Sequence, residues 1–284
     1  PAEEFIDISE RLELKKSGKI SFLSGKQEMI KKGVFDDIDL AMLVHTSTGN
    51  GSNSIHIGGT SNAHIAHHVK FLGRSAHAGG SPEKGVNALQ AAVLAMNAIN
   101  TQRETLQEHD VARIHGIIVK GGSAVSAVPD EVIYEGRVRS VDVSRLEEIN
   151  SQVLRCYRAG ALGIGANVEI QSIPGYLPMK NNMGLQDIFG INSESILGPN
   201  SVHKSPNNES LGGSTDMGDL SNLIPSIHPY SISAIGTGHG ADYLINDYDL
   251  ATVIPAQIMV GSIIDLLCDD ARKGNNVKVN FRPS

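Results

Sequence analysis

The side chains best suited to chemistry are two adjacent carboxylates and three histidines in polar or glycine-rich segments. Glu3 and Glu4 are neighbours, so one could bind a cation while the other takes a proton from water on that cation. His45 ends the apolar segment DLAMLVH, and His239 lies between glycines in GTGHGADY. Taken singly, each has a simpler interpretation: a solvated glutamate pair, a histidine at a strand end and a loop histidine.

The third histidine, His77, lies in the segment GRSAHAGGSPEKGVNAL, residues 73–89. Ser81 before Pro82 predicts the N-cap and the first position of a helix. A helix N-terminus offers unpaired N–H groups and a positive dipole end to an anion. From the residues alone, a surface histidine in a turn is an equally good interpretation.

A polar glycine loop, GGSTDMGD, occupies residues 212–219. It could present backbone N–H groups and the hydroxyls of Ser214 and Thr215 to a carboxylate. The loop does not match the Gly-x-Ser-x-Gly elbow of serine hydrolases, and the sequence contains neither a phosphate-binding P-loop nor a Cys-x-x-Cys motif.

Length and composition favour an ordinary two-domain globular protein. The 284 residues are 40% hydrophobic and carry a net charge of -7 without a block of Lys or Arg, which argues against nucleic acid and against an anionic membrane surface. No apolar segment is expected to approach the roughly 20 residues of a membrane span. Cys156 and Cys268 lie far apart, which favours a reducing cytoplasm over a disulfide framework. The start at Pro1, without a signal peptide, predicts the interior of a longer protein.

Hydrophobic periodicity is regular in the middle of the chain. It predicts the order β-α-β-β-α-β of a ferredoxin-like sandwich. The expected strands are residues 66–73, 112–120, 131–140 and 168–173, and the expected helices are residues 87–106 and 143–159.

The flanking segments are less regular. Helices are predicted at 26–32, where Gly33 is a natural end, and at 183–191 and 247–268. Strands are predicted at 39–45 and 231–235. Residues 46–60 are expected to form a loop or a weak hairpin, residues 198–213 a polar loop, and residues 275–284 to be loosely held.

Together these segments resemble the aminoacylase and carboxypeptidase family of dinuclear-zinc hydrolases, metallopeptidase family M20, over nearly the whole chain. PAEE matches the family's Glu-Glu site, and GVFDDIDLAMLVH matches its acidic strand with a ligand histidine. GRSAHAGGSPEKGVNAL and GGSAVSAVPDEVIYEGRVR are similar to its lid domain. GGSTDMGD followed by IPSIHP is most similar to the branch with aminobenzoyl-glutamate hydrolase and dipeptidase-like members.

The resemblance implies an α/β fold with two domains. A zinc-peptidase-like catalytic domain, incomplete at its N-terminus, would comprise residues 1–62 and 177–284. A ferredoxin-like α+β lid and dimerisation domain would be inserted between them at residues 63–176.

The resemblance also assigns the metal site. Glu3 would be the general base, Glu4 and His45 would bind one metal, and His239 would bind the other. The resemblance implies two divalent ions, and zinc is the expected metal. A mixed histidine and carboxylate site would also accept manganese or cobalt.

Substrate contacts are implied in the same way. His77 would reach from the lid of one subunit into the partner's site to stabilise an oxyanion. Arg139 and the loop of Gly213, Ser214 and Thr215 would hold the substrate's carboxylate, for which a guanidinium fork is well suited. The implied protein is a cytoplasmic homodimer that hydrolyses the amide bond of N-acyl amino acids or dipeptides.

Three departures from the family pattern leave an alternative open. The family's His-x-Asp segment is absent, residues 5–26 form a charged insertion, and Ser126 stands where many members carry asparagine. The isolated chain could therefore be a non-catalytic fragment that only dimerises or binds a ligand. A structural spacer is a weaker third hypothesis.

Overall fold

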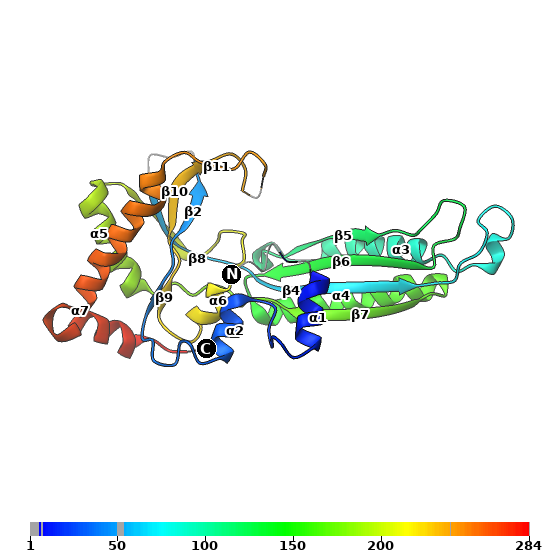
Figure 1. Ribbon diagram of the computed structural model, residues 1–284, viewed down its shortest axis with the longest axis horizontal. Helices are drawn as coiled ribbons and strands as arrows, with labels where there is room; N and C mark the ends of the chain where they lie inside the picture. The colour runs from blue at the N-terminus through cyan, green and yellow to red at the C-terminus, as the bar shows by residue number, and fades with distance from the viewer. Residues whose placement is uncertain (1–5, 7, 50–53, 239, 284) are drawn as a thin grey trace. The chain divides into compact units, whose positions relative to one another are not determined.

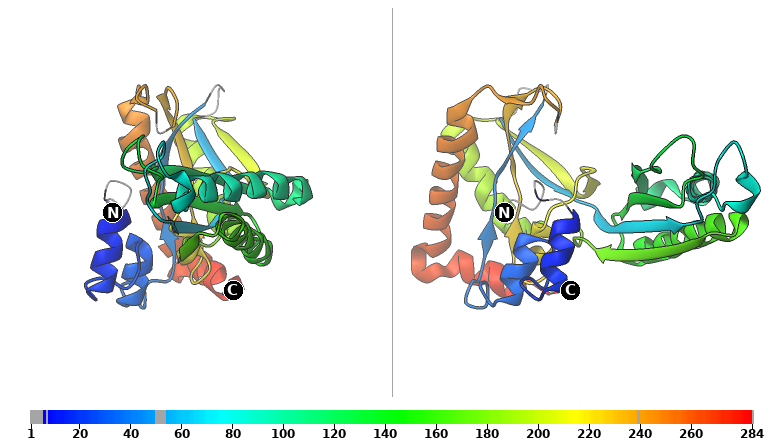
Figure 2. Two further views of the ribbon diagram at one scale, coloured as in Figure 1. Left: turned by 90° about the vertical axis from the view of Figure 1, so that its right-hand side faces the viewer. Right: turned by 45° about the vertical axis from the view of Figure 1, so that its right-hand side comes forward.

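A computed structural model describes residues 6, 8–49, 54–238 and 240–283. The chain divides into two compact units (Figures 1 and 2). Unit 1 comprises Pro1–Ser61 and Pro178–Ser284, and unit 2 comprises Asn62–Leu177.

Unit 2 is an antiparallel four-stranded sheet with two helices. The strand order β5-β6-β4-β7 and the element order confirm the predicted ferredoxin-like sandwich. The strands are β4 (Ala63–Leu72), β5 (Arg113–Lys120), β6 (Glu131–Ser140) and β7 (Asn167–Pro174), and the helices are α3 (Ala88–Gln102) and α4 (Val143–Ile164).

One face of this sheet packs against both helices. Val69, Phe71 and Tyr134 from the strands share a buried core with residues of α3 and α4, including Tyr157. Because successive strand residues point to opposite faces, the alternate residues, among them Arg137 and Arg139 on either side of buried Val138, lie on the open face. The same alternation separates His67 from His68, as the sequence predicted.

Helices α3 and α4 approach most closely at Gly160. A Cβ atom there would lie 2.6 Å from both the Ala91 carbonyl oxygen and the Ala95 backbone nitrogen. At Gly163, three residues along the same helix, a Cβ would meet only Leu94 Cδ2, at 2.8 Å. The backbone atoms that face Gly160 cannot move aside, whereas the end of the Leu94 side chain that faces Gly163 can.

We therefore expect Gly160→Ala to destabilise unit 2 by about 1–3 kcal/mol through overpacking. Gly163→Ala should be neutral or stabilising by up to about 1 kcal/mol, because alanine favours a helix over glycine. Hydrogen exchange of the α4 amides in the two variants compares them. Equal protection in both would contradict the close packing at Gly160.

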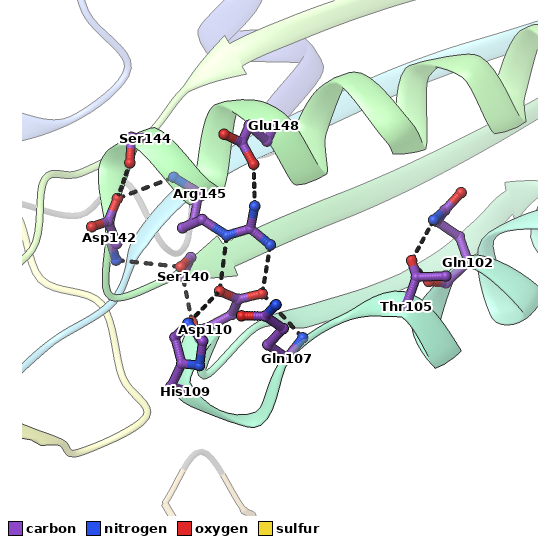
Figure 3. Close-up of polar contacts among 10 residues, drawn as sticks. All are labelled: Gln102, Thr105, Gln107, His109, Asp110, Ser140, Asp142, Ser144, Arg145 and Glu148. Carbon is purple, nitrogen blue, oxygen red and sulfur yellow. Dashed lines mark hydrogen bonds and ion pairs between the residues drawn. The ribbon is translucent and has the colours of Figure 1, made fainter.

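An ion pair between the buried Asp110 carboxylate and the partly exposed Arg145 anchors the turn before β5 to the start of α4 (Figure 3). Arg145 Nε and Nη2 each donate to one carboxylate oxygen of Asp110 at 2.9 Å, and the Asp110 side chain has no exposed surface. The Gln107 N–H donates to the same carboxylate at 3.2 Å, and Ser140 Oγ donates to the Asp110 carbonyl at 2.9 Å. The hydrogen bonds from Arg145, and to a smaller extent from Gln107, hold the pKa of the Asp110 carboxyl below its usual value.

Unit 1 contains a mixed five-stranded sheet in the order β11-β10-β3-β8, with β2 also paired to β10, and a separate parallel pair β1-β9. Its strands are β1 (Ala41–Met42), β2 (His45–Thr48), β3 (Ile55–Thr60), β8 (Val202–Ser210), β9 (Ser226–Ile227), β10 (Tyr230–Ile235) and β11 (Leu244–Ile245). Its helices are α1 (Ile8–Lys16), α2 (Gly25–Lys31), α5 (Met183–Leu197), α6 (Met217–Ser221) and α7 (Ile254–Asn280), the last preceded by a π-helical turn, Asp249–Val253.

Several predictions for unit 1 were wrong. The segment expected as a loop or weak hairpin at 46–60 contains β2 and β3, which both pair with β10, and the loop expected at 198–213 contains β8. Their serines, threonines and glycines pair in the sheet around a few buried residues such as Ile55 and Ile57. His45 begins β2 and does not end a strand, since the strand predicted at 39–45 shortens to β1. Gly33, in contrast, follows the C-cap of α2 with φ of 73°, as predicted.

The C-terminal helix also differs from expectation. Residues predicted to be loosely held continue α7 to Asn280 after a kink with positive φ at Asp269, Asp270 and Ala271, and Val277 packs in the core. The helical stretch Asp249–Asn280 is long and apolar enough to cross a membrane, with a hydropathy of 1.8 over 18 residues, so the expectation that no segment comes near that length is wrong. Length and composition alone are weak evidence, because core helices also meet them; 22% of the window is buried.

Candidate active site

His45 has the hydrogen-bond geometry of a metal-binding histidine. Its Nδ1 lies 2.6 Å from the Thr46 carbonyl oxygen. A carbonyl can only accept, so Nδ1 carries the proton and Nε2 keeps a lone pair. Histidines that bind metals commonly donate their other N–H to a backbone carbonyl in this way. The exposed His45 ring therefore fits a metal through Nε2.

Two further rings surround His45 at the start of β10. The His228 and Tyr230 rings both lie with centroids 6.0 Å from that of His45. Burial, with a smaller effect of His45, lowers the pKa of His228 to about 4, so this imidazole is neutral at pH 7. His228 thus adds an aromatic wall beside His45 without adding a charge.

Tyr243, which directly precedes β11, is held beside β2. Tyr243 Oη and Thr46 Oγ1 are 2.8 Å apart, and Thr46 follows His45 directly. Strands β10 and β11 pair as a hairpin. His239 itself, like Glu3 and Glu4, lies outside the described residues.

The Gly213–Thr215 loop is anchored on the same side of unit 1. Thr215 lines a small cavity of about 10 Å³ together with His228 and Tyr230. The next residue, Asp216, forms a largely buried salt bridge at 2.6 Å with Lys26 Nζ and accepts from the Lys26 N–H at 3.2 Å. Lys26, the last residue of the charged insertion at residues 5–26, therefore anchors the polar loop through Asp216.

His77 is exposed, and its Nδ1 accepts two backbone hydrogen bonds. The N–H groups of Gly79 and Gly80 donate to His77 Nδ1 at 3.2 and 2.9 Å, so in the neutral ring the proton is on Nε2. The residues on both sides of His77 are bonded to a second loop, since the Ala78 N–H donates to the Ser126 carbonyl at 2.8 Å and the Val128 N–H donates to the Ala76 carbonyl at 2.9 Å. An exposed, preoriented N–H donor results.

The prediction that a helix begins at Ser81, next to His77, was wrong. Ser81 makes no side-chain cap and only a 3-10 turn, Pro82–Lys84, follows it. Helix α3 begins at Ala88, where the Asn87 side chain accepts from two backbone N–H groups. The ring is therefore oriented by the two glycine amides and not by a helix dipole. A pocket of about 620 Å³ opens beside this loop, with Pro82, Leu89 and Val125 in its lining.

Arg139 lies half-buried on the open face of the sheet in unit 2. Its pairing partners on the neighbouring strands are Arg113 on β5 and His64 on β4. Burial and the neighbouring Arg137 lower the pKa of the Arg139 guanidinium, which still remains charged at neutral pH. A half-buried guanidinium is a strong partner for a carboxylate.

Among the described residues, no group of three His, Cys, Asp or Glu side chains is placed to hold a metal ion. Of the four expected metal-site residues, only His45 is described, and its donor geometry fits a metal. Sequence reasoning did not single out His228, Lys26 or Tyr243. Only His228 had a signal, as the histidine of the segment IPSIHP.

Comparisons with known proteins identify relatives. Residues 60–162 match the M20 peptidase dimerisation domain. The chain is 32% identical over 212 residues to Xaa-Arg dipeptidase of Mus musculus, covering 72% of this chain and 46% of the relative. It is 30% identical over 161 residues to a p-aminobenzoyl-glutamate hydrolase polypeptide of Escherichia coli, covering 55% of this chain and 32% of the relative. The chain thus spans about half the length, or less, of these curated relatives.

Solved structures share the fold. A dinuclear metal binding peptidase of the M20 family from Bacillus subtilis superposes with a TM-score of 0.62 at 16% identity, covering 86% of this chain and 62% of that one. An aminobenzoyl-glutamate utilization protein from Klebsiella pneumoniae gives a TM-score of 0.63 at 17% identity, covering 84% and 57%. The chain thus carries the M20 peptidase dimerisation domain, and its homologues and structural neighbours are M20 peptidases and amidohydrolases.

Proposed function

We propose that this protein is a metal-dependent amidohydrolase that cleaves the amide bond of N-acyl amino acids or dipeptides. The observation that carries the proposal is the hydrogen bond from His45 Nδ1 to the Thr46 carbonyl, which leaves Nε2 for a metal. The names of the relatives support the reaction class, since they are a dipeptidase and an aminobenzoyl-glutamate hydrolase. The alternative of a chain that only dimerises or binds a ligand has less support, because these relatives are hydrolases.

Four residues would form the metal and proton-transfer site. Glu4 and His45 would hold one divalent ion and His239 would hold the other, with zinc first and manganese or cobalt as alternatives. The bound ions supply a water of lowered pKa and polarise the scissile carbonyl. Glu3 would take the proton of that water and deliver it to the leaving amine.

The substrate would be held by the two remaining groups of residues. Arg139 and the loop of Gly213, Ser214 and Thr215 would bind its carboxylate. The Nε2–H of His77 would donate to the developing oxyanion, because its Nδ1 is occupied by two amide N–H groups.

We infer that the active protein is a cytoplasmic homodimer in which His77 serves the partner's site. The matched dimerisation domain supports the dimer, since it covers residues 60–162 and thus includes His77. The small-molecule substrate would be enclosed when the lid closes over it.

Chelation should abolish hydrolysis of an N-acyl amino acid, and zinc should restore it.

His45→Ala should weaken zinc binding more than roughly 100-fold, beyond the usual effect of losing a residue that only orients a metal ligand. A competition titration against a chromophoric chelator measures this affinity. His203→Ala, an exposed histidine of β8 in the same sheet, is the matched control. Unchanged zinc affinity in His45→Ala would exclude His45 as a ligand.

A further inference from the structure

The side chain of Asn181 joins two backbone segments of unit 1. Its Nδ2 donates to the carbonyls of Gly59 and Gly58 at 2.8 and 3.3 Å, and its Oδ1 accepts from the His228 N–H at 2.9 Å. A flipped amide would set its oxygen against two carbonyls and its NH₂ group against another N–H, so the partners fix its orientation. These three hydrogen bonds form the Asn181 clamp.

The glycine end of the Asn181 clamp lies at an irregularity of β3. Gly58 and Gly59 have φ of 86° and 70°, and the register of β3 with β8 shifts between Gly58 and Thr60. A Cβ atom on Gly58 would overlap the Ser205 carbonyl oxygen, so glycine is required there. Bulges interrupt the ladder and leave backbone groups to be paired by other means. The Asn181 amide pairs two such carbonyls.

The other end of the Asn181 clamp holds the segment that faces His45. Pro229, directly after His228, accepts from the His45 N–H at 3.0 Å. Since Pro229 has no N–H of its own, the His228 N–H is the nearest backbone donor that can tie this segment to β3. The His228 and His45 rings also stack, with centroids 6.0 Å apart and planes 27° apart. A shift of the 228–229 backbone would therefore disturb both contacts that hold His45.

We propose that Asn181 is a positioning residue of the metal site, which acts on His45 through the backbone of His228 and Pro229. This inference rests on the proposed function, in which His45 Nε2 binds a metal. The hydrogen bond from Nδ1 to the Thr46 carbonyl fixes the His45 ring relative to its own strand. The Asn181 clamp adds a link to β3 and thereby helps to fix the ring relative to the rest of the sheet.

The zinc affinity of Asn181→Ala, measured by competition with a chromophoric chelator, tests this role. It should fall roughly tenfold, the lower end of the usual effect of losing a group that orients a metal ligand. Asn222→Ala is the matched control, because the Asn222 side chain likewise donates to two backbone carbonyls of unit 1, those of Gly218 and Pro178, at 2.8 and 3.1 Å. Both variants should lower the melting temperature, but Asn222→Ala should keep its zinc affinity within about twofold of the wild type.

A second readout requires neither metal nor activity. Long-range proton–nitrogen correlation spectra of the metal-free protein show which nitrogen of a neutral imidazole carries the proton. His45 should be protonated on Nδ1 in the wild type and in Asn222→Ala, because Nδ1 donates to the Thr46 carbonyl. In Asn181→Ala the ring should populate both tautomers. If Asn181→Ala does not fold, Asn181→Ser, whose hydroxyl can keep one of the three hydrogen bonds, should show both effects at a smaller size.

Two outcomes would overturn the positioning role. One is a wild-type zinc affinity together with a single Nδ1–H tautomer in the folded Asn181 variant. The other is an equal loss of zinc affinity in Asn181→Ala and Asn222→Ala, which would indicate general destabilisation. His45→Ala separates this inference from the proposed function: if it does not weaken zinc binding, the proposed function fails, whereas a loss in His45→Ala without a loss in Asn181→Ala contradicts the positioning role alone.

Discussion

Replacing His77 with alanine is expected to lower kcat for amide hydrolysis roughly 10²–10³-fold and to leave zinc affinity unchanged. The reason is the fixed direction of its proton. With Nδ1 accepting from Gly79 and Gly80, the ring can only donate through Nε2, as an oxyanion donor must. Because this contact strengthens in the transition state, kcat should fall more than KM rises.

His109→Ala is the control for His77→Ala. His109 is another exposed histidine of unit 2, with 77% of its side chain accessible, and no role in the reaction is assigned to it. Steady-state kinetics with one N-acyl amino acid and a zinc titration compare the two variants. A loss of zinc binding in His77→Ala, or kinetics equal to those of His109→Ala, would show that His77 does not act on the oxyanion.

Asp110→Ala is expected to destabilise unit 2 by about 1–3 kcal/mol, because Arg145 and the Gln107 N–H lose their hydrogen bonds to a buried carboxylate. Glu148→Gln removes the other carboxylate that contacts Arg145, but 60% of the Glu148 side chain is exposed, so it should cost less than about 1 kcal/mol. Hydrogen exchange of the β6 amides measures unit 2 separately from unit 1. Similar losses in the two variants would show that burial of the Asp110–Arg145 pair contributes little.

The same ion pair predicts how stability depends on pH. The pKa of Asp110 is lowered in the folded state, so its contribution is fully present above the unfolded value of about 3.9 and is lost as the pH falls through the folded pKa. Asp110→Asn should therefore flatten the acid limb of unit 2 stability below about pH 4. If Asp110→Asn loses stability at low pH just as the wild type does, other carboxylates cause that loss.

Unit 2 could be predicted from the sequence because its core is periodic. Apolar residues alternate along β6, and they recur at helical spacing along α4. Unit 1 was less predictable, because β8 is rich in polar residues and β2 has none of the usual apolar alternation. These strands are specified by pairing with β3 and β10, which are far away in the sequence.

The candidate site was likewise only partly predictable from the sequence. Its motifs identified His45 and His77 as residues of interest, but they did not reveal which ring nitrogen carries the proton, since that depends on Thr46 and on two glycine amides. Contacts such as Lys26 with Asp216 join residues 190 positions apart. Local pattern cannot reveal them, because only the folded backbone brings these side chains together.

The central claim is that an M20-type hydrolytic site combines the base of one subunit with His77 of another. The most direct measurement is the activity of a refolded equimolar mixture of Glu3→Gln and His77→Ala chains of the active protein. Each variant alone should be nearly inactive, and random dimers should recover about a quarter of wild-type activity, since half of them contain one intact site out of two. A mixture no more active than its separate components would contradict the shared site and leave His77 with a local role.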